Sequence, residues 1–169
     1  MQRVAVVGSG GAGKTTFAVA CSEATGLPVV HLDKHFWHPG WIESDPEDWR
    51  ERQADLLIGD EWIADGNYGN TLDLRLSLAD TIIWLDFSRY VCLLGAVRRI
   101  LFHFGRPVQA TGCPERFDWE FLKWVWKFPQ ESRPKLLSAI DRHGREVDVL
   151  RFQSRRESKE FLRNLQKRS

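Results

Sequence analysis

The sequence predicts an α/β fold in which a parallel sheet is covered by helices on both faces. Three observations support this prediction: short apolar runs alternate with helix-forming segments, a phosphate-binding motif follows the first run, and a glycine or an aspartate follows several others. Parallel strands covered on both faces have few polar residues. Five such runs occur, at 3–7, 28–32, 62–64, 81–85 and 147–152.

Helix-forming segments separate these runs. The first is expected at about 13–25, because a glycine and then a proline follow it. The second begins at Asp45-Pro46, with Asp45 as the N-cap and Pro46 in the first helical position. Two more are expected at about 88–103 and 155–167. The former carries an apolar stripe formed by Val91, Leu94, Val97 and Leu101.

One region breaks the alternation of strands and helices. More than forty residues, from about 104 to 146, separate the third long helix from the last strand, and arginines lie at the entrance. An insertion of this size is typical of a lid, which we place at about 104–134. Within it, a helix over 117–128 is expected to end at Pro129, and another helix is expected over about 134–142.

Composition narrows the function classes. A chain of 169 residues is interpreted as one domain, 1–169, and its net charge of +1 gives no general attraction for nucleic acid or acidic membranes. We therefore expect neither direct DNA binding nor membrane association. The three cysteines have no metal or redox spacing, and no signal peptide precedes the first strand, so we expect a cytoplasmic protein.

The segment from Gly8 to Thr15, Gly-Ser-Gly-Gly-Ala-Gly-Lys-Thr, is a complete Walker A loop between the first strand and the first helix. Its small residues let main-chain N–H groups face phosphate oxygens, and the helix N-terminus adds positive potential. Lys14 is expected to reach the β- and γ-phosphates, and the Thr15 hydroxyl to bind Mg²⁺. The expected nucleotide-binding residues are Gly8, Ser9, Gly10, Gly11, Ala12, Gly13, Lys14, Thr15 and Thr16.

Three carboxylates end predicted strands and are candidates for the site, because ligands of such sheets bind at the carboxyl ends of strands. Asp65, in Asp-Gly-Asn-Tyr, is expected in the Mg²⁺ shell, directly or through water. Asp33 is expected to orient the acceptor hydroxyl or take its proton. Asp86 matches a Walker B pattern equally well, although a capping or loop role is favoured because Ser88 and a helix follow at once.

Arginines near the insertion are candidates for offsetting the charge of the transferred group. We favour Arg99 and Arg106, which flank its entry, over Arg98, Arg116 and Arg133.

Histidines and aromatic residues admit two interpretations. The three histidines at 31, 35 and 38 lie near one acidic residue only, so we favour packing over a zinc site. An aromatic or base-like acceptor could stack on a group of rings, although ordinary packing explains them equally well: Phe36, Trp37, Trp41 and Tyr68. Packing or a homodimer surface is the favoured role of a second group: Trp119, Trp124 and Trp126.

Three features together, the Walker A loop, the short Asp-Gly element after the third strand and the arginine-flanked insertion before the fifth, resemble the adenylate-kinase-like group of P-loop kinases. More narrowly, from Met1 to about Pro134, the chain resembles the bacterial proteins labelled DNA topology modulation proteins. The elements that carry this resemblance are Val29-Val30-His31-Leu32-Asp33, Phe36-Trp37, Pro39-Gly40-Trp41, Asp65-Gly66-Asn67-Tyr68, Leu72-Asp73-Leu74-Arg75 and Gly112-Cys113-Pro114-Glu115-Arg116.

This resemblance implies a strand order of 2-3-1-4-5, ATP or GTP as the donor with Mg²⁺, and a mobile lid. It does not supply the acceptor. Adenylate kinases bind their nucleoside monophosphate through an arginine in the second helical segment, for which Arg50 and Arg52 are poor counterparts. This departure from adenylate kinases argues against AMP as the acceptor.

The function predicted from the sequence is a Mg²⁺-dependent ATP phosphotransferase that moves the γ-phosphate to a small-molecule or nucleotide acceptor. The alternative is a nucleotide-dependent regulatory or nucleic-acid-associated P-loop protein with weak ATPase activity. A GTPase switch is disfavoured, because the sequence contains no Asn-Lys-x-Asp guanine-binding motif.

Overall fold

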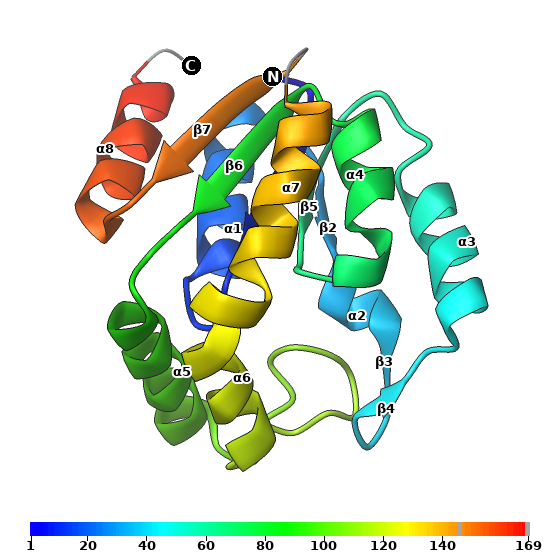
Figure 1. Ribbon diagram of the computed structural model, residues 1–169, viewed down its shortest axis with the longest axis vertical. Helices are drawn as coiled ribbons and strands as arrows, with labels where there is room; N and C mark the ends of the chain where they lie inside the picture. The colour runs from blue at the N-terminus through cyan, green and yellow to red at the C-terminus, as the bar shows by residue number, and fades with distance from the viewer. Residues whose placement is uncertain (145–146, 168–169) are drawn as a thin grey trace.

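A computed structural model describes residues 1–144 and 147–167 of the chain. Five parallel strands form one sheet, in the order β2-β5-β1-β6-β7 (Figure 1). Counted among these five strands, the order is 2-3-1-4-5, so the predicted α/β architecture is confirmed. The strands are β1 (Arg3–Gly8), β2 (Val29–His31), β5 (Trp62–Asp65), β6 (Thr81–Leu85) and β7 (Asp148–Phe152).

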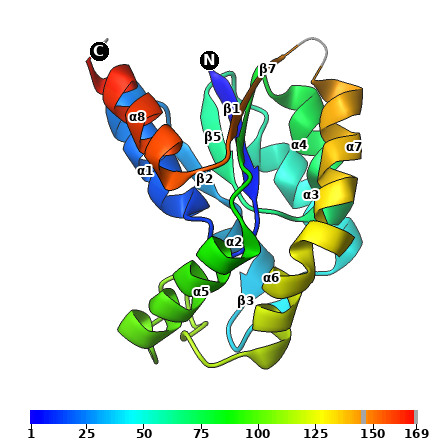
Figure 2. The same ribbon diagram turned by 60° about the vertical axis from the view of Figure 1, so that its left-hand side comes forward.

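Helices cover both faces of the sheet and make a three-layer sandwich (Figure 2). One face is covered by α1 (Lys14–Thr25) and α8 (Arg155–Gln166), and the other by α4 (Leu72–Leu78) and α7 (Arg133–His143). The helix α3 (Pro46–Leu56) begins at Pro46 as predicted, and the Asp45 carboxylate accepts hydrogen bonds from the N–H groups of Glu47 and Asp48.

The central strand β1 shows why the apolar runs contain so few polar residues. Val4 and Val6 pack into the core beneath α1 and α8, whereas Ala5 and Val7 pack into the core beneath α4 and α7. All four side chains are fully buried, because successive side chains of a strand point to opposite faces and both faces are covered.

Several short elements between the strands and long helices were not predicted. The strand expected to reach residue 32 ends at His31, and Leu32 begins the short helix α2 (Leu32–Phe36). A two-stranded hairpin follows, β3 (Trp37–His38) and β4 (Ile42–Glu43), and a 3₁₀ turn, η1 (Gly69–Thr71), precedes α4. Elements this short are stabilised by tertiary contacts rather than by local periodicity.

The helices after β6 differ from the prediction at one proline. Two long helices were expected and are present, α5 (Arg89–His103) and α6 (Trp119–Glu131). Pro129 was expected to end the second of them, which is wrong, because α6 continues through it to Glu131. The proline lacks one N–H donor, but the next turn closes when the Ser132 N–H donates to the Phe128 carbonyl at 3.0 Å.

The buried face of α5 also differs from the apolar stripe seen in the sequence. Cys92, Ala96 and Ile100 are buried, whereas Leu94 and Leu101 are exposed by 70% and 73%. The small side chains at positions 92 and 96 let α5 approach the phosphate-binding loop closely, and this contact decides which face turns inward.

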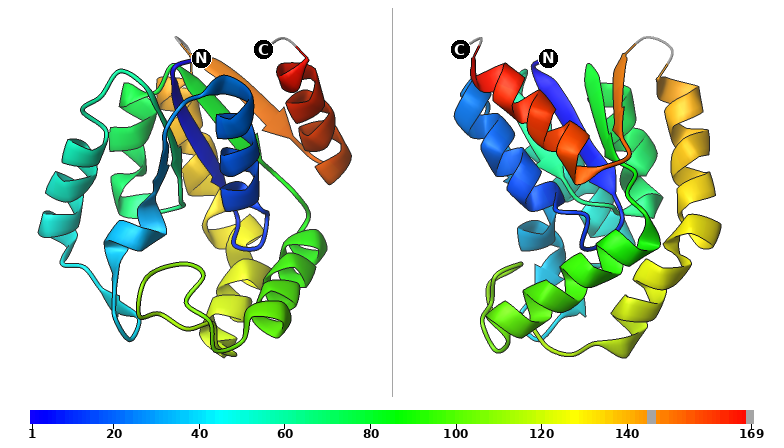
Figure 3. Two further views of the ribbon diagram at one scale, coloured as in Figure 1. Left: turned by 180° about the vertical axis from the view of Figure 1, so that it is seen from behind. Right: turned by 90° about the vertical axis from the view of Figure 1, so that its left-hand side faces the viewer.

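The start of β1 and the end of α8 lie at one end of the molecule, and α5, α6 and the segment between them lie at the other (Figure 3). Within residues 1–144 and 147–167, no helix is both long enough and apolar enough to cross a lipid bilayer.

Candidate phosphoryl-transfer site

The Walker A loop lies between β1 and α1, as the sequence predicts, and two helices pack tightly on it. Gly11 has a left-handed φ of 72°, and a side chain there would collide with the main chain of α5. A Cβ atom on Gly10 would lie 2.8 Å from the Phe121 ring and 3.0 Å from the Trp124 ring, both on α6. The loop therefore needs glycine both for its conformation and for its neighbours.

The loop offers main-chain donors without acceptors. In the described part of the chain, the N–H groups of Gly10, Gly11 and Gly13 donate to no protein acceptor, and the first turn of α1 adds further free N–H groups. Such a set of donors at a helix N-terminus fits phosphate oxygens. The hydroxyl-bearing residues Thr15 and Thr16 are exposed beside it. Nucleotide binding by these residues stays a prediction.

Lys14 lies at the centre of a cluster of charged groups. Its ammonium group donates to the Ser9 carbonyl oxygen at 2.9 Å. Burial lowers the pKa of Lys14 below its ordinary value, and the nearby carboxylates of Asp33 and Asp65 oppose that decrease. The structure therefore brings together the lysine and two of the three carboxylates that the sequence singled out.

Asp65 is the last residue of β5 and is 4% exposed. Its Oδ1 atom lies 3.0 Å from Nδ1 of His31, the last residue of the neighbouring strand β2. The parallel pairing of the two strands places His31 opposite Asp65, so the contact follows from the register. Neither residue belongs to a group of three or more potential metal-binding side chains within the described residues. His31 holds the carboxylate in one orientation.

Asp33 lies in the first turn of α2, one residue after the point where the sequence predicted the strand to end. Its Oδ1 atom accepts a hydrogen bond of 2.5 Å from the Tyr68 hydroxyl. Burial raises the pKa of Asp33, although the bond from Tyr68 and the charge of Lys14 act in the opposite direction. A carboxyl group with a raised pKa is suited to exchange a proton with an acceptor hydroxyl.

Gln109 connects Asp33 to Arg99. With the amide nitrogen turned toward Asp33, it donates to Asp33 Oδ2 at 2.7 Å, while the amide oxygen accepts from Arg99 Nη2 at 3.0 Å. The Arg99 Nε atom also lies 3.0 Å from Oε1 of Glu115, and its guanidinium group lies over the Phe121 ring. Arg99, which the sequence analysis favoured, therefore joins the cluster.

The other candidate arginines lie elsewhere. Arg106 is exposed, and its side chain contacts no other described residue through a hydrogen bond or an ion pair. Arg98 lies over the Phe102 ring, and Arg116 forms only a long, exposed contact of 3.8 Å to Asp118. Arg106 therefore joins the predicted site only if the segment that carries it moves.

Asp86 is bound to two arginines rather than standing free. It accepts two hydrogen bonds of 2.9 Å from Arg133 and two from Arg151, at 2.9 and 2.6 Å. Burial alone would raise the pKa of Asp86, but the bonds from Arg133 and Arg151 outweigh it and lower that pKa. The Walker B alternative thus has its carboxylate oxygens already occupied, and Arg133 is not available to a transferred phosphate.

A buried arginine, Arg75 on α4, lies behind the Asp33–Tyr68 pair. Its Nη1 atom donates to Gln53 Oε1 at 3.2 Å, and Nη2 is 3.5 Å from the Gly66 carbonyl oxygen. Gln53 is itself fully buried and exchanges two hydrogen bonds with Thr71. No carboxylate of the described residues contacts Arg75, so its charge is stabilised by neutral oxygen atoms and by the nearby acidic groups.

The connection from α5 to α6, residues 104–118, closes over the β3–β4 hairpin. The Gly40 N–H donates to the Gly112 carbonyl at 2.9 Å, and the Trp41 indole donates to the Pro114 carbonyl at 2.9 Å. The Cys113 thiol donates to the His38 carbonyl at 3.1 Å. Together with the Gln109 contact, these bonds place the connection across the Asp33 side of the site.

The aromatic residues near Asp33 pack on one another. The Phe36 and Tyr68 ring centroids are 4.4 Å apart, and Trp49 lies 4.9 Å from Tyr68 and 5.2 Å from Phe36. Trp37 meets Phe36 and Trp41 edge to face. The interpretation as ordinary packing therefore describes this structure, and the rings form a wall beneath Asp33 rather than an open stacking slot.

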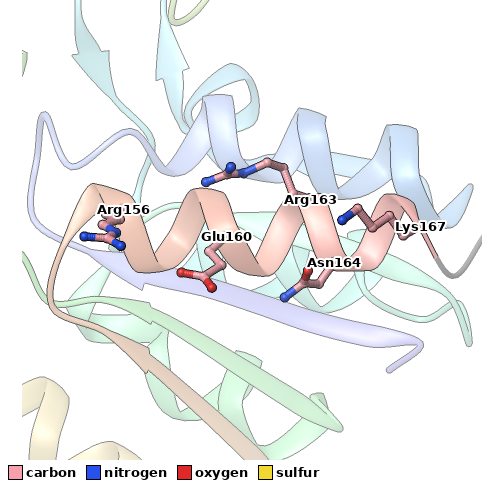
Figure 4. Close-up of a pocket in the computed structure, with 5 residues that line it drawn as sticks. All are labelled: Arg156, Glu160, Arg163, Asn164 and Lys167. Atoms are coloured by element: carbon pink, nitrogen blue, oxygen red, sulfur yellow. The ribbon is translucent and has the colours of Figure 1, made fainter.

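Two surface hollows lie away from the Lys14 cluster. One, of about 280 Å³, lies along α8, where Arg163 and Lys167 point to one side of the helix and Glu160 to the other, so the charges do not converge (Figure 4). The second, of about 290 Å³, lies between the start of α4 and the junction of α6 with α7. Neither is lined by the loop lysine or its carboxylates.

Sequence reasoning missed several members of this arrangement. His31 and Tyr68 were noticed only as packing or stacking residues, whereas both hold a carboxylate. Arg75 was noticed only as part of the family-like element Leu72-Asp73-Leu74-Arg75, because polar residues alternate with leucines throughout this segment and do not single out a buried arginine. Gln109 had none, because it lies in an irregular segment.

Comparison with known proteins identifies the fold. No protein-family model matches the chain, and no curated protein resembles it significantly in sequence. Among solved structures, it is similar to deoxyadenosine kinase from M. mycoides with products dCMP and dCDP bound, with a TM-score of 0.55 and 11% identity over 95% of this chain and 96% of that one.

Two further solved structures are similar over nearly their whole length. A putative kinase from Chloroflexus aurantiacus has a TM-score of 0.52 and 14% identity, covering 97% of this chain and 96% of that one. Shikimate kinase from Acinetobacter baumannii, in complex with shikimate, has a TM-score of 0.52 and 16% identity, covering 100% of this chain and 95% of that one. The chain therefore has the fold of P-loop kinases.

Proposed function

We propose that the protein is a Mg²⁺-dependent phosphotransferase that moves the γ-phosphate of ATP to a hydroxyl group of a small-molecule or nucleotide acceptor. The observation that carries the proposal is the meeting of Lys14 with Asp33 and Asp65 beside a Walker A loop in which three glycine N–H groups donate to no acceptor among the described residues. The kinase fold of its structural neighbours supports the same reaction class.

Each residue would have a distinct task. The loop N–H groups and Lys14 would bind the β- and γ-phosphates, and the Thr15 hydroxyl and the Asp65 carboxylate would hold Mg²⁺, a cation that prefers such oxygen ligands. The bound metal ion would offset negative charge on the phosphates. Asp33 would accept a hydrogen bond, or the proton, from the acceptor hydroxyl.

Arg99 is the arginine best placed to stabilise the transferred group, because it already lies near Lys14 and Asp33. The lid role proposed for the insertion at 104–134 fits the same geometry. Residues 104–118 lie across the Asp33 side of the site, so they must move to admit an acceptor, and this movement would let Arg106 approach the phosphates.

Two variants test the proposal. Lys14→Ala is compared with the exposed control Lys159→Ala, and Asp33→Asn is compared with the exposed control Asp60→Asn. We expect Lys14→Ala to lose Mg·ATP binding in isothermal titration calorimetry while its circular dichroism spectrum is unchanged. We expect Asp33→Asn to keep nucleotide affinity and to lose acceptor-stimulated ADP release. Unchanged ATP affinity in Lys14→Ala would contradict the proposed nucleotide site.

The acceptor can be sought with the wild-type chain in a coupled ADP-release screen of nucleosides, nucleoside monophosphates, sugars and hydroxy acids. The alternative function, a nucleotide-dependent regulator with weak ATPase activity, predicts instead slow ADP release that no acceptor stimulates. A salt-dependent complex with DNA would favour that alternative. The diverging charges along α8 give such a complex little support.

A further inference from the structure

The outer side of α5 and α6 exposes large apolar side chains that the proposed reaction does not use. On α5, Tyr90, Leu94 and Leu101 are exposed by 69%, 70% and 73%, and on α6, Trp119 and Trp126 are exposed by 65% and 42%. We call these five residues the α5–α6 apolar face. Exposed apolar groups are common singly, but a contiguous set of this size marks an interaction surface.

The five side chains form one continuous surface. Residues 90, 94 and 101 recur at the spacing of one helix face, and residues 119 and 126 are seven apart, which again places them on one face. Ala96 and Ile100 of α5 pack against Leu122 of α6, and the two helices lie side by side (Figure 1). The Tyr90 and Trp126 rings touch edge to face across the boundary between the helices, with centroids 5.7 Å apart.

The size of this face matches one side of a stable interface. With the exposed fractions above, the five side chains present about 700 Å² of accessible surface, because aromatic side chains of this kind bring roughly 150–250 Å² each. A standard protein–protein interface buries about 800 Å² on each partner. The remaining area can come from the half-buried Val97 and from aliphatic stems at the margin.

The lysines on the α6 side of the face are paired with glutamates, so they give no support to an anionic polymer or membrane as its partner. Lys127 lies 3.1 Å from Glu131, and Lys123 lies 3.8 Å from Glu120, so the basic groups of α6 are neutralised within the helix. Arg89 is stacked over the Trp126 ring at 5.0 Å. Tryptophan, tyrosine and arginine are the residues most common at the centre of protein interfaces.

We propose that the α5–α6 apolar face is the interface of a homodimer, in which the helix pair of one copy packs on the same helix pair of a second copy. Two such pairs would form a four-helix arrangement about a two-fold axis, and a self-complementary face of mixed charge suits this symmetry. The net charge of +1 creates no repulsion between copies. The interface would lie on the two helices that flank residues 104–118.

The experiment is sedimentation equilibrium of the full chain from about 1 to about 100 μM, a range that separates weak from stable interfaces of standard size. The test variant is Leu94→Glu/Leu101→Glu, and Leu94→Lys/Leu101→Lys tests the opposite charge. The control is Ile58→Glu, because Ile58 is 78% exposed and lies between α3 and β5. Circular dichroism verifies that each variant is folded.

We expect the wild type and the Ile58 control to sediment at twice the chain mass of 19.6 kDa. Both double variants should raise the dissociation constant by about 100-fold or more, because charges would be buried at the centre of the interface. A wild type that stays monomeric at the highest concentration would overturn the proposal. A dimer that persists in both folded double variants would overturn it too.

Discussion

Replacing Gln53 by leucine tests whether the network behind the site depends on neutral oxygen atoms that stabilise a buried charge. Gln53 makes two hydrogen bonds with Thr71 and accepts a third from Arg75, at 3.2 Å. Leucine has a similar volume but no polar atoms. The substitution would therefore leave the Arg75 guanidinium group buried with only the Gly66 carbonyl, 3.5 Å away, in hydrogen-bonding range.

The expected loss follows from these three bonds. Two neutral hydrogen bonds contribute about 1 kcal/mol each, and one to a charged group contributes about 1.5–3 kcal/mol. Gln53→Leu should therefore destabilise the fold by about 4 kcal/mol, a large part of the roughly 5–15 kcal/mol that stabilises a typical domain. Burial lowers the pKa of Arg75 to about 10, so the side chain is still charged at neutral pH and the loss applies there.

Arg75→Met gives the opposite comparison, because it removes the charge together with its hydrogen bonds and keeps an apolar chain in place. Replacing a buried charge in this way costs far less than leaving it without partners, here about 1 kcal/mol. The double variant Gln53→Leu/Arg75→Met should therefore be more stable than Gln53→Leu alone. Such a non-additive result is the signature of two residues in direct contact.

The assay is urea unfolding at pH 7, followed by circular dichroism and tryptophan fluorescence. Gln153→Leu is the matched control, because Gln153 is exposed and its side chain makes no hydrogen bond within the described residues, and it should change stability by less than about 0.5 kcal/mol. If Arg75→Met is as destabilising as Gln53→Leu, or if the two losses simply add, the account of a charge held by Gln53 is wrong.

Three further predictions concern the site and its surroundings. In Tyr68→Phe, Asp33 loses the hydrogen bond that lowers its pKa, so the acidic limb of the pH profile of ADP release should shift to higher pH; an unchanged profile would remove Asp33 from the reaction. Asp86→Asn should lower the free energy of unfolding by about 2 kcal/mol at pH 7. Because the pKa of Asp86 is lowered in the folded state, the difference in stability between wild type and variant should shrink only as the pH falls below about 4. Urea unfolding at several pH values measures this difference. Gln109→Ala should free residues 104–118 and speed trypsin cleavage after the exposed Arg116 several-fold; equal cleavage rates would show that Gln109 does not hold this segment.

The elements that the sequence predicts correctly are those whose cause is local. The Walker A loop, the first helix and its glycine stop, and the Asp45 cap were all predicted, because their residue types act within a few positions of one another. The buried strands were predicted for a similar reason, since a strand covered on both faces must be apolar along its whole length. Pro129 was misread because a late proline removes one hydrogen bond without ending a packed helix.

The alternation of strands and helices and the Walker A loop were enough for the sequence alone to determine an α/β fold of the P-loop kind, and to nominate Lys14, Asp33 and Asp65. Only the tertiary structure decided which groups hold them, because His31, Tyr68 and Gln109 meet these carboxylates across 34, 35 and 76 positions of the chain. It likewise decided that α5 turns its small residues to the loop and leaves Leu94 in solvent. Periodicity shows that a helix has an apolar face, but the neighbours against which it packs select the face that is buried.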